Sequence, residues 1–232
     1  LGFPSSSSHA LIGGFIGAVA IGAGIGAIKM EGLQKVLIAL FTSPIIGLLA
    51  GYIILRLILL FSWNASPKIN AFYKRSQIVT SLALGLSHGT NDAQKTMGII
   101  TLALVTGGYL EFFAVPVWVV FACSIMIALG TSLGGWKLIR TLGSKFYKIR
   151  PIDGFASQMA SAIVILGASL FGGPVSTTQV VSTAIMGVGA AERVNKVRWN
   201  VAYEIATAWL LTIPATALVA AGFYWLLNHF FA

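Results

Sequence analysis

The chain alternates between long apolar segments and short polar connections. Seven apolar segments can be marked, at residues 10–28, 36–62, 77–107, 114–134, 154–171, 177–190 and 200–231. A helix needs about 20 apolar residues to cross the hydrocarbon core of a bilayer. Most of the segments reach or approach that length, so the pattern predicts an all-α, polytopic integral membrane protein.

Three of these segments depart from a simple membrane span. Residues 154–171 and 177–190 are short and are joined at Gly172-Gly173-Pro174. Two short helices around a Gly/Pro turn suit a re-entrant hairpin, which enters the membrane and returns on the same side. Residues 77–107 are interrupted by a polar run at 87–95, which predicts a broken helix.

Composition supports a membrane protein and excludes an ordinary soluble domain. The chain is 57% hydrophobic and 9% charged, with a mean hydropathy of +0.88, whereas soluble domains carry about 25% charged residues. The single cysteine, Cys123, excludes a disulfide within the chain. The net charge of +9 does not indicate a nucleic-acid partner, because the basic residues lie in the connections, where membrane topology accounts for them. We expect a multi-pass protein of the cell membrane.

Those basic residues predict the topology. The connections at 63–76, 135–153 and 191–199 are rich in Lys and Arg, and the connection at 108–113 has none. The positive-inside rule places the first three in the cytoplasm and 108–113 outside. Counting back across the second segment puts 29–35 outside as well. Because 135–153 and 191–199 fall on one side, the two segments between them must be re-entrant.

A hydroxyl-rich motif occurs twice. Pro4-Ser5-Ser6-Ser7-Ser8-His9 reappears as Pro174-Val175-Ser176-Thr177-Thr178-Gln179 at an offset of 170 residues, which also relates Gly17 to Gly187 and Pro44 to Pro214. Each motif stands between a Gly/Pro break and an apolar run. Helices that start inside a membrane in this way present their N-termini to a polar ligand.

The offset and the connection charges together predict two inverted repeats, as in secondary transporters. Residues 1–62 would end the first repeat, 63–76 would be a short cytoplasmic linker, and 77–232 would form the second repeat. In this arrangement the first hydroxyl motif opens outward and the second opens inward.

The two motifs predict an oxyanion site. Neutral hydroxyl donors at two helix N-termini suit an anion that must be released again, and no Arg is present to hold it tightly. The candidate residues are Ser6, Ser7, Ser8, Ser176, Thr177, Thr178 and Gln179. Simple N-capping of two helices is the alternative interpretation. His9 occupies the position equivalent to Gln179, and for both a hydrogen bond to the ligand or a strut within the hairpin is open.

The polar run at 87–95 predicts a cation site. An unpaired Asp in mid-membrane costs roughly 2.5–3.5 kcal/mol, and oxygen-bearing side chains surround Asp92. The candidate ligands of a coupling cation are Thr90, Asn91, Asp92 and Gln94, with Na⁺ placed at Asn91 and Asp92. The alternative is a structural ion pair of Asp92 with Lys95. We assign Lys95 and His9 to gating or to an ion pair.

The same residues resemble a known family. The run from Gly85 to Lys95 (GLSHGTNDAQK) resembles the signature of the inorganic phosphate transporter family. The second hydroxyl motif with Ile185-Met186-Gly187-Val188-Gly189 is similar to its C-terminal motif, and Gly2-Phe3-Pro4 through His9 is similar to the matching motif of the first repeat. The resemblance covers essentially the whole chain. It implies Na⁺- or H⁺-coupled symport of inorganic phosphate through inverted repeats.

The sequence departs from the family pattern in three places. The family has a further Asn-Asp motif upstream of the position of Pro4, and it is absent here. The resemblance therefore implies that half of the ion site and part of the anion site lie in a missing N-terminal part of the same protein. Gln179 stands where many members have His, and the central insertion of some members is reduced to the loop at 63–76.

The residues also have to be weighed against other functions. Transport of sulfate or another tetrahedral oxyanion would use the same motifs. An intramembrane serine hydrolase would need a base beside its nucleophile, yet neighbouring Ser8 and His9 would point about 100° apart on a helix. A channel differs from a symporter in lacking uphill uptake. We expect a transporter and not an enzyme, with no cofactor beyond the coupling ion; the sequence leaves open whether the chain forms a homo-oligomer.

Overall fold

The computed structural model describes residues 5–144 and 146–231, with residues 136–144 and 231 as backbone only, and this part of the chain is helical without strands. The helices are α1 (Ser7–Gly22), α2 (Met30–Phe61), α3 (Ile69–Thr106), α4 (Val117–Ser144), α5 (Pro151–Leu170), α6 (Thr177–Glu192) and α7 (Trp199–Phe231), with short 3₁₀ turns η1 (Ile25–Ala27) and η2 (Val194–Lys196). Pro4 of the first hydroxyl motif lies outside the described residues.

Four stretches are long and apolar enough to cross a membrane, namely Met30–Phe61, Val117–Gly135, Pro151–Leu170 and Trp199–Phe230. The predicted all-α membrane protein is thus confirmed.

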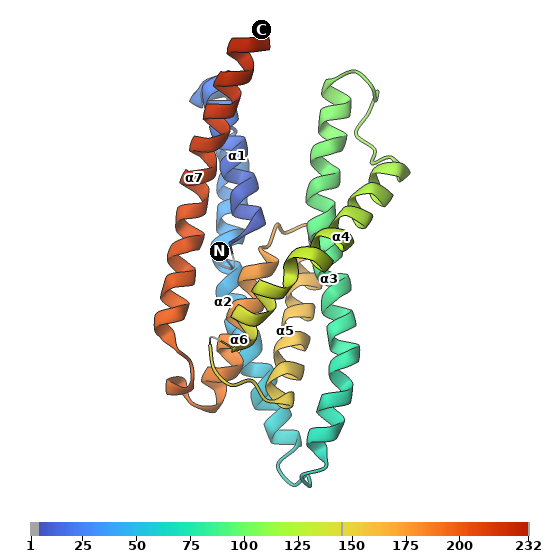
Figure 1. Cartoon of the computed structure of the whole chain (residues 1–232), viewed down its shortest axis with the longest axis vertical. Helices are drawn as coiled ribbons and strands as arrows, with labels where there is room; N and C mark the ends of the chain where they lie inside the picture. Colours follow the sequence, from blue (N-terminus) through green and yellow to red (C-terminus); the bar gives the residue numbers. More distant parts are fainter. Residues whose placement is uncertain (1–4, 145, 232) are drawn as a thin grey trace.

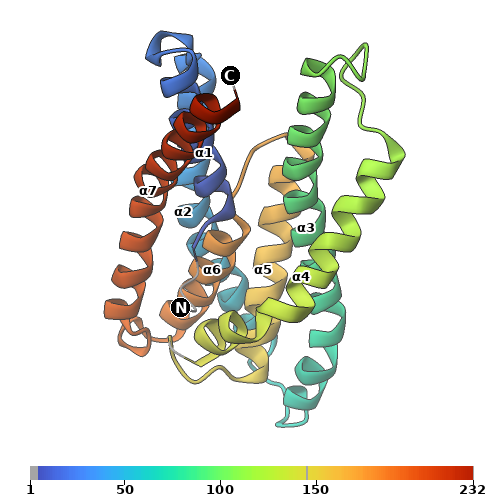
Figure 2. The ribbon, with the colours of Figure 1, turned by 45° about the horizontal axis from the view of Figure 1, so that its top comes forward.

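The connections are sorted between the two ends of the molecule as the charge pattern predicts. The connections α2–α3, α4–α5 and α6–α7, in the regions rich in Lys and Arg, lie at the lower end in Figure 1. The connections α1–α2 and α3–α4 lie at the upper end, and the second view agrees (Figure 2). We call the lower end the basic end.

Helices α5 and α6 form a hairpin that turns back halfway along the molecule. Its two outer ends are at the basic end (Figure 1). Near its turn, the hydroxyl of Ser169 donates to Asn91 Oδ1 of α3 at 3.5 Å, and α3 continues past Asn91 to Thr106, a rise of about 22 Å. The predicted hairpin is therefore present, with its turn at mid-height as a re-entrant hairpin requires.

A glycine in a left-handed conformation makes the hairpin turn. Gly172 has φ +67° and follows Phe171, the C-cap residue of α5. Its N–H bonds to Ser169 O at 3.2 Å, while that of Gly173 bonds to Ala168 O at 2.8 Å. This pair of bonds is the Schellman pattern that ends a helix. It frees the following residues to run extended up to Ser176, the N-cap residue of α6.

The predicted break in the third segment is wrong. Helix α3 is continuous from Ile69 to Thr106 through the polar run. The hydroxyls of Ser87 and Thr90 donate to carbonyl oxygens one turn earlier, at 2.8 and 2.7 Å, so these side chains are satisfied without unwinding the backbone. The helix also starts eight residues before the apolar segment, so much of the predicted linker at 63–76 is helical.

The 170-residue offset reappears in the secondary structure. Helices α1 and α6 have bounds that differ by that offset at both ends, and Pro44 and Pro214 lie inside α2 and α7 at the same offset. Figure 1 shows that α1 runs upward and α6 downward from mid-height, while α2 runs downward and α7 upward. Two similar helix pairs thus point in opposite directions, with the N-termini of α1 and α6 meeting near the middle.

Close glycine contacts fix these pairs to each other. A Cβ added at Gly17 of α1 would lie 2.0 Å from the carbonyl oxygen of Ala217 in α7, and one at Gly187 of α6 would lie 2.0 Å from that of Leu48 in α2. Small residues let membrane helices approach until their backbones touch. The short helix of each pair, α1 or α6, is therefore packed against the long helix of the other pair, α7 or α2.

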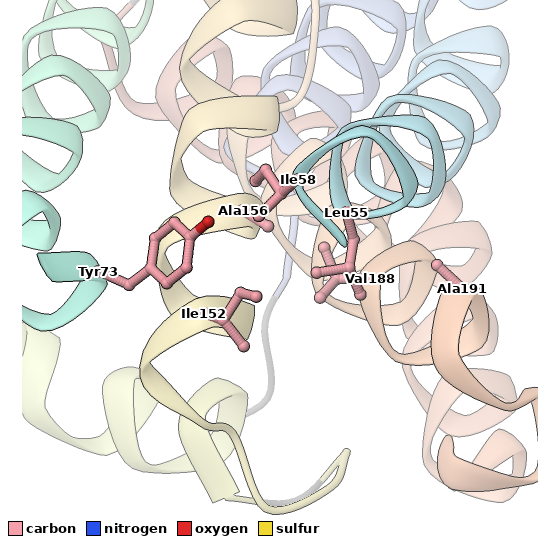
Figure 3. Packing of buried hydrophobic residues seen from close by; sticks show 7 residues of the cluster. All are labelled: Leu55, Ile58, Tyr73, Ile152, Ala156, Val188 and Ala191. Carbon is pink, nitrogen blue, oxygen red and sulfur yellow. The ribbon is translucent and has the colours of Figure 1, made fainter. Parts of the chain in front are cut away.

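The basic end is closed by a compact apolar cluster and an ionic network. Side chains of α2, α3, α5 and α6 form the cluster (Figure 3): Leu55, Ile58, Tyr73, Ile152, Ala156, Val188 and Ala191. Beside it, the fully buried Asp153 accepts from Arg150 Nη2 and Lys196 Nζ, both at 3.1 Å. Both cations also pair with Glu192, so the network joins the start of α5 to the end of α6.

The glycine contacts predict opposite effects for two neighbouring substitutions in α1. Gly17→Ala should lower the melting temperature of the purified protein, because overpacking costs about 1–3 kcal/mol. Gly14 has open space around its Cβ position, so Gly14→Ala should leave the protein as stable or raise stability by up to about 1 kcal/mol through helix propensity. Thermal unfolding in detergent measures both. Equal melting temperatures for the two variants would contradict the close α1–α7 contact.

Candidate substrate and cation site

One face of α3 carries the polar residues at mid-height. His88, Asn91, Asp92 and Lys95 follow one another at intervals of three, one and three residues, which places them on one side of a helix. That side faces the N-terminal ends of α1 and α6. The site is therefore built by one long helix and two helix starts.

Lys95 joins all three elements. Its ammonium group donates to Asp92 Oδ1 at 3.0 Å, to Ser8 Oγ of α1 at 2.8 Å, and to the carbonyl oxygen of Val175, before α6, at 2.8 Å. The Lys95 side chain is 17% exposed. A buried ammonium with three acceptors is satisfied as a donor, so this residue connects the repeated motifs to each other.

Asp92 and Asn91 supply the oxygen atoms of the site. The Asp92 carboxylate accepts from the Thr177 hydroxyl at 3.3 Å and stands 3.6 Å from His88 Nδ1. Asn91 is buried, and its amide donates to the carbonyl oxygen of Val175 at 3.3 Å. The predicted ion pair of Asp92 with Lys95 is present, and the same carboxylate also reaches the second hydroxyl motif.

Two cavities adjoin this cluster. One, of about 270 Å³, is lined by Ser7, Asp92, Lys95 and Thr96 together with apolar residues. The other, of about 210 Å³, is lined by Asn91, Gln94, Lys95, Ser169 and the hairpin turn. Each has room for several waters at about 30 Å³ apiece. Lys95 thus lines both cavities and Asp92 lines one of them, and each is large enough for a small hydrated ion.

The hydroxyl residues divide into caps and cavity residues. Ser6 accepts from the backbone N–H of His9 at 3.1 Å, and Ser176 accepts from that of Gln179 at 3.4 Å, so these two side chains are N-caps as the alternative interpretation expects. Ser7, Ser8 and Thr177 are not caps. They face the cavity, Lys95 and Asp92 respectively. Thr178 is half-buried beside them.

His9 and Gln179 are equivalent in burial as well as in sequence. His9 is fully buried, with its ring 6.0 Å from that of Phe41, and neither ring nitrogen has a hydrogen-bond partner among the described residues. Gln179 is 2% exposed, and its Oε1 is likewise unpaired in that part of the chain. His9 does not contact the Ser8 hydroxyl, which donates to Val175 O. The geometry of a serine hydrolase is thus absent at this motif.

The remaining predicted cation ligands lie on the neighbouring face of α3. Thr90 and Gln94 line a cavity of about 720 Å³ between α3 and α4, and Gln94 also reaches the 210 Å³ cavity. Residues four apart share a helix face, so Thr90 and Gln94 lie together on a face of α3 next to the one that carries Asp92. The structure therefore brings Asn91 and Asp92 together with Lys95, whereas Thr90 and Gln94 line cavities that Asp92 does not line.

Two functional groups escape analysis of the sequence. The carbonyl oxygen of Val175 accepts from Ser8, Asn91 and Lys95, and the Ser169 hydroxyl reaches Asn91. Val175 has an apolar side chain, and its backbone carbonyl makes these contacts. The sequence could have indicated this only through the position of Val175 in an extended segment before an N-cap, where a carbonyl has no helical partner.

The set of groups suits a hard cation and an oxyanion better than a transition metal. Within residues 5–144 and 146–231, no three His, Cys, Asp or Glu side chains lie together as metal ligands. Carboxylate, amide and backbone oxygens are the ligands that hard cations prefer. The ammonium of Lys95, the Ser7 hydroxyl and the free N–H groups of two helix starts are donors for an anion.

The sequence of the chain is similar to proteins of one known family. The profile of the "Phosphate transporter family" matches residues 1–69 and 62–220. A "Probable low-affinity inorganic phosphate transporter" of Bacillus subtilis (strain 168) is 44% identical over 99% of this chain and 70% of its own length. One from Rhizobium meliloti (strain 1021), with the same description, is 46% identical over 96% of this chain and 67% of its own length.

A solved structure shares the fold. The structure described as "The sodium-dependent phosphate transporter" matches with a TM-score of 0.89 and 24% identity, over 99% of this chain and 75% of that one. The relatives confirm the prediction of a multi-pass transport protein and not an enzyme. A family profile that covers nearly the whole chain, with relatives at 44–46% identity, is decisive: this chain belongs to the phosphate transporter family.

Proposed function

We propose that the chain forms part of a secondary transporter that moves inorganic phosphate across the cell membrane together with a cation, by alternating access. The observation that carries the proposal is the meeting of two oppositely directed helix starts, α1 and α6, on the Asp92–Lys95 pair of α3. Family membership supports phosphate as the substrate. The description of the structural neighbour as sodium-dependent favours Na⁺ over H⁺ as the coupling ion.

Phosphate would bind in the 270 Å³ cavity beside the first hydroxyl motif, next to the Asp92 carboxylate that the second motif contacts through Thr177. Ser7, Asp92 and Lys95 line that cavity. Ser8 is hydrogen-bonded to Lys95, and Thr177 is hydrogen-bonded to Asp92. Hydroxyl and backbone donors at helix starts can replace the hydration shell of an oxyanion. Because Lys95 is its only fixed cation within the described cluster, the site would hold the anion loosely enough to release it.

The coupling cation would bind at Asp92 and Asn91. A carboxylate beside a dianion in a low-dielectric site is electrostatically unfavourable, and a Na⁺ bound next to both reduces their repulsion. Each ion would then raise the affinity of the site for the other, which is the thermodynamic requirement for coupling. In the absence of ions, Lys95 would hold the carboxylate as the present ion pair does.

The opposed pairs α1–α2 and α6–α7 would act as inverted repeats. In such transporters, two similar halves of opposite direction open the central site to one side at a time. The first and last residues of α1 and α6 are each 170 residues apart, which supports this assignment. A preceding segment of the same protein would complete the ion and anion sites, and the lipid bilayer is the remaining partner.

The first test concerns Asp92. If it binds the coupling cation, Asp92→Asn should abolish sodium activation and most phosphate uptake by the complete transporter in proteoliposomes, with an unchanged melting temperature. Glu31→Gln, which removes an exposed carboxylate, is the matched control and should transport normally. Retained sodium activation in Asp92→Asn would refute the assignment. A purely structural pair would instead make Lys95→Ala and Asp92→Asn equally unstable.

The second test separates ligand contacts from helix caps. Truncation of Thr177 or Ser7 to Ala should weaken phosphate binding several-fold, since one neutral hydrogen bond contributes about 0.5–1.5 kcal/mol net. Ser176→Ala removes a cap and should lower stability by about 1 kcal/mol with little change in affinity. The measurements are phosphate affinity and melting temperature, side by side. Unchanged affinity in both Ala variants would place the anion elsewhere.

The third test concerns orientation in the membrane. In a Cys123→Ala background, Tyr109→Cys should react with an impermeant thiol reagent on intact cells, because its connection would lie outside. Val194→Cys, at the basic end, should react only after permeabilisation. Both positions are well exposed, at 81% and 60%, so differences in burial do not confound the result. Labelling of Val194→Cys on intact cells would reverse the topology.

A further inference from the structure

A separate cavity lies at the basic end, between α3, α5 and α6. It measures about 500 Å³, and its lining includes Lys74, Gln77, Arg150, Ser157, Leu84 and Val181. None of these residues belongs to the site at Asp92. We call it the basic-end cavity.

A polar seam between α3 and α5 leads from this cavity towards the centre of the molecule. At the basic end, Gln77 Nε2 donates to the carbonyl oxygen of Pro151 at 2.6 Å, and Thr80 Oγ1 donates to Gln158 Oε1 at 2.6 Å. At mid-height the same two helices meet again through Ser169 and Asn91. Such side chains hydrogen-bond membrane helices to each other, and a row of them beside a cavity also offers polar groups along a route for an ion.

An apolar group interrupts this seam. Ile165 and Val180 are fully buried against each other, with Leu84 and Val181 packed beside them. We call these four residues the apolar plug. Leu84 and Val181 also line the basic-end cavity, so the plug forms its inner wall.

The order of residues along three helices places the plug between the cavity and the central site. On α3 the order is Lys74, Leu84, Asn91, where the first lines the cavity and the last belongs to the site. The distance from Leu84 to Asn91 along the helix is about 10 Å. On α6, Ile185 lines the cavity, Val181 belongs to the plug, and Thr177, one turn before Val181, contacts Asp92.

Helix α5 repeats this order. Ser157 lines the basic-end cavity, Ile165 belongs to the plug and Ser169 reaches Asn91. Three helices therefore agree on cavity, plug and site in sequence from the basic end.

The charges at the mouth of the cavity favour an anion. Arg150 is neutralised by Asp153 and Glu192, with which Lys196 also pairs. Lys74 has no acidic partner within ion-pair distance in the part of the chain that the structure describes. A single unpaired cation in a partly enclosed space gives a positive potential that concentrates anions.

We propose that the basic-end cavity is a vestibule for phosphate on the basic side, and that Leu84, Ile165, Val180 and Val181 are the closed inner gate. The inference rests on the proposed function and adds the route by which the anion leaves the site. Opening would separate the α5–α6 hairpin from α3 at the plug and join the two halves of the polar seam. The gate residues act by excluding water and ions, and they touch no substrate while closed.

Thiol accessibility tests the vestibule directly. In a Cys123→Ala background of the complete transporter in vesicles, Ser157→Cys should react with an impermeant anionic methanethiosulfonate added on the basic side, and not from the other side. Lys74→Gln should slow this anionic reagent several-fold without slowing a neutral one. Lys68→Gln, an exposed basic residue outside the cavity, is the control and should change neither rate. An unreactive Ser157→Cys would overturn the proposal.

The gate has its own test. Ser169→Cys, which lies beyond the plug, should be unreactive from the basic side and become reactive when combined with Leu84→Ser. Leu82→Ser alters an exposed position on the same helix and should leave Ser169→Cys unreactive. Val181→Ser provides a second way to open the plug if Leu84→Ser does not fold. No gain of reactivity with either folded plug variant would show that the apolar plug is not a barrier.

The outcomes also distinguish the ligand and the parent hypothesis. In neutral-lipid vesicles, inorganic phosphate should slow the labelling of Ser157→Cys. Protection by anionic lipid, with no effect of phosphate, would make the cavity a headgroup site and overturn the vestibule. Labelling needs neither sodium nor uptake, so one-sided access without phosphate transport would refute the proposed function alone. Transport with an inaccessible Ser157→Cys would refute the vestibule alone.

Discussion

The ammonium group of Lys95 is the contact on which the centre of the molecule depends. It links α3, the start of α1 and the segment before α6 through three hydrogen bonds. In a bilayer, each of these acceptors would be costly to leave unpaired. The carbonyl oxygen of Val175 in particular is free because the hairpin turn and the cap of α6 leave its segment extended. One buried cation thus stabilises both the broken backbone of the hairpin and the charge of Asp92.

That arrangement suits the exchange of partners that the proposed mechanism requires. The carboxylate of Asp92 contacts Lys95, Thr177 and His88. Each of these three residues reaches it through one side-chain atom. An arriving cation could replace the ammonium at the carboxylate, and the released ammonium could then turn to an anion. Exchange of partners of this kind needs rotamer changes rather than unfolding. It is therefore compatible with a helix that stays continuous through the whole polar run.

The sequence predicts the architecture better than the detail of the site. Apolar lengths and basic connections were sufficient for the membrane class and the hairpin, because both follow from the hydrophobic thickness and the charge asymmetry of a membrane. The break predicted at residues 87–95 failed for a specific reason. Polarity alone does not unwind a helix when hydroxyls such as those of Ser87 and Thr90 can bond to the preceding turn. Nor can composition reveal that Ser6 caps while Ser7 lines a cavity, since one residue's shift around a helix decides it.

The packing of the helices indicates where movement is least costly. The pairs α1–α7 and α2–α6 are in backbone contact through Gly17 and Gly187, and such interfaces cannot slide without steric overlap. The interface between α3 and α5 is different, because it is made by apolar side chains and side-chain hydrogen bonds around a cavity of about 500 Å³, and no glycine of the described residues brings the two backbones into contact there. Helices in backbone contact tend to move as units, whereas helices packed through side chains can shift by changes of rotamer. Rearrangement of the transporter should therefore occur between α3 and the α5–α6 hairpin, which is also where the charged pair meets the second hydroxyl motif.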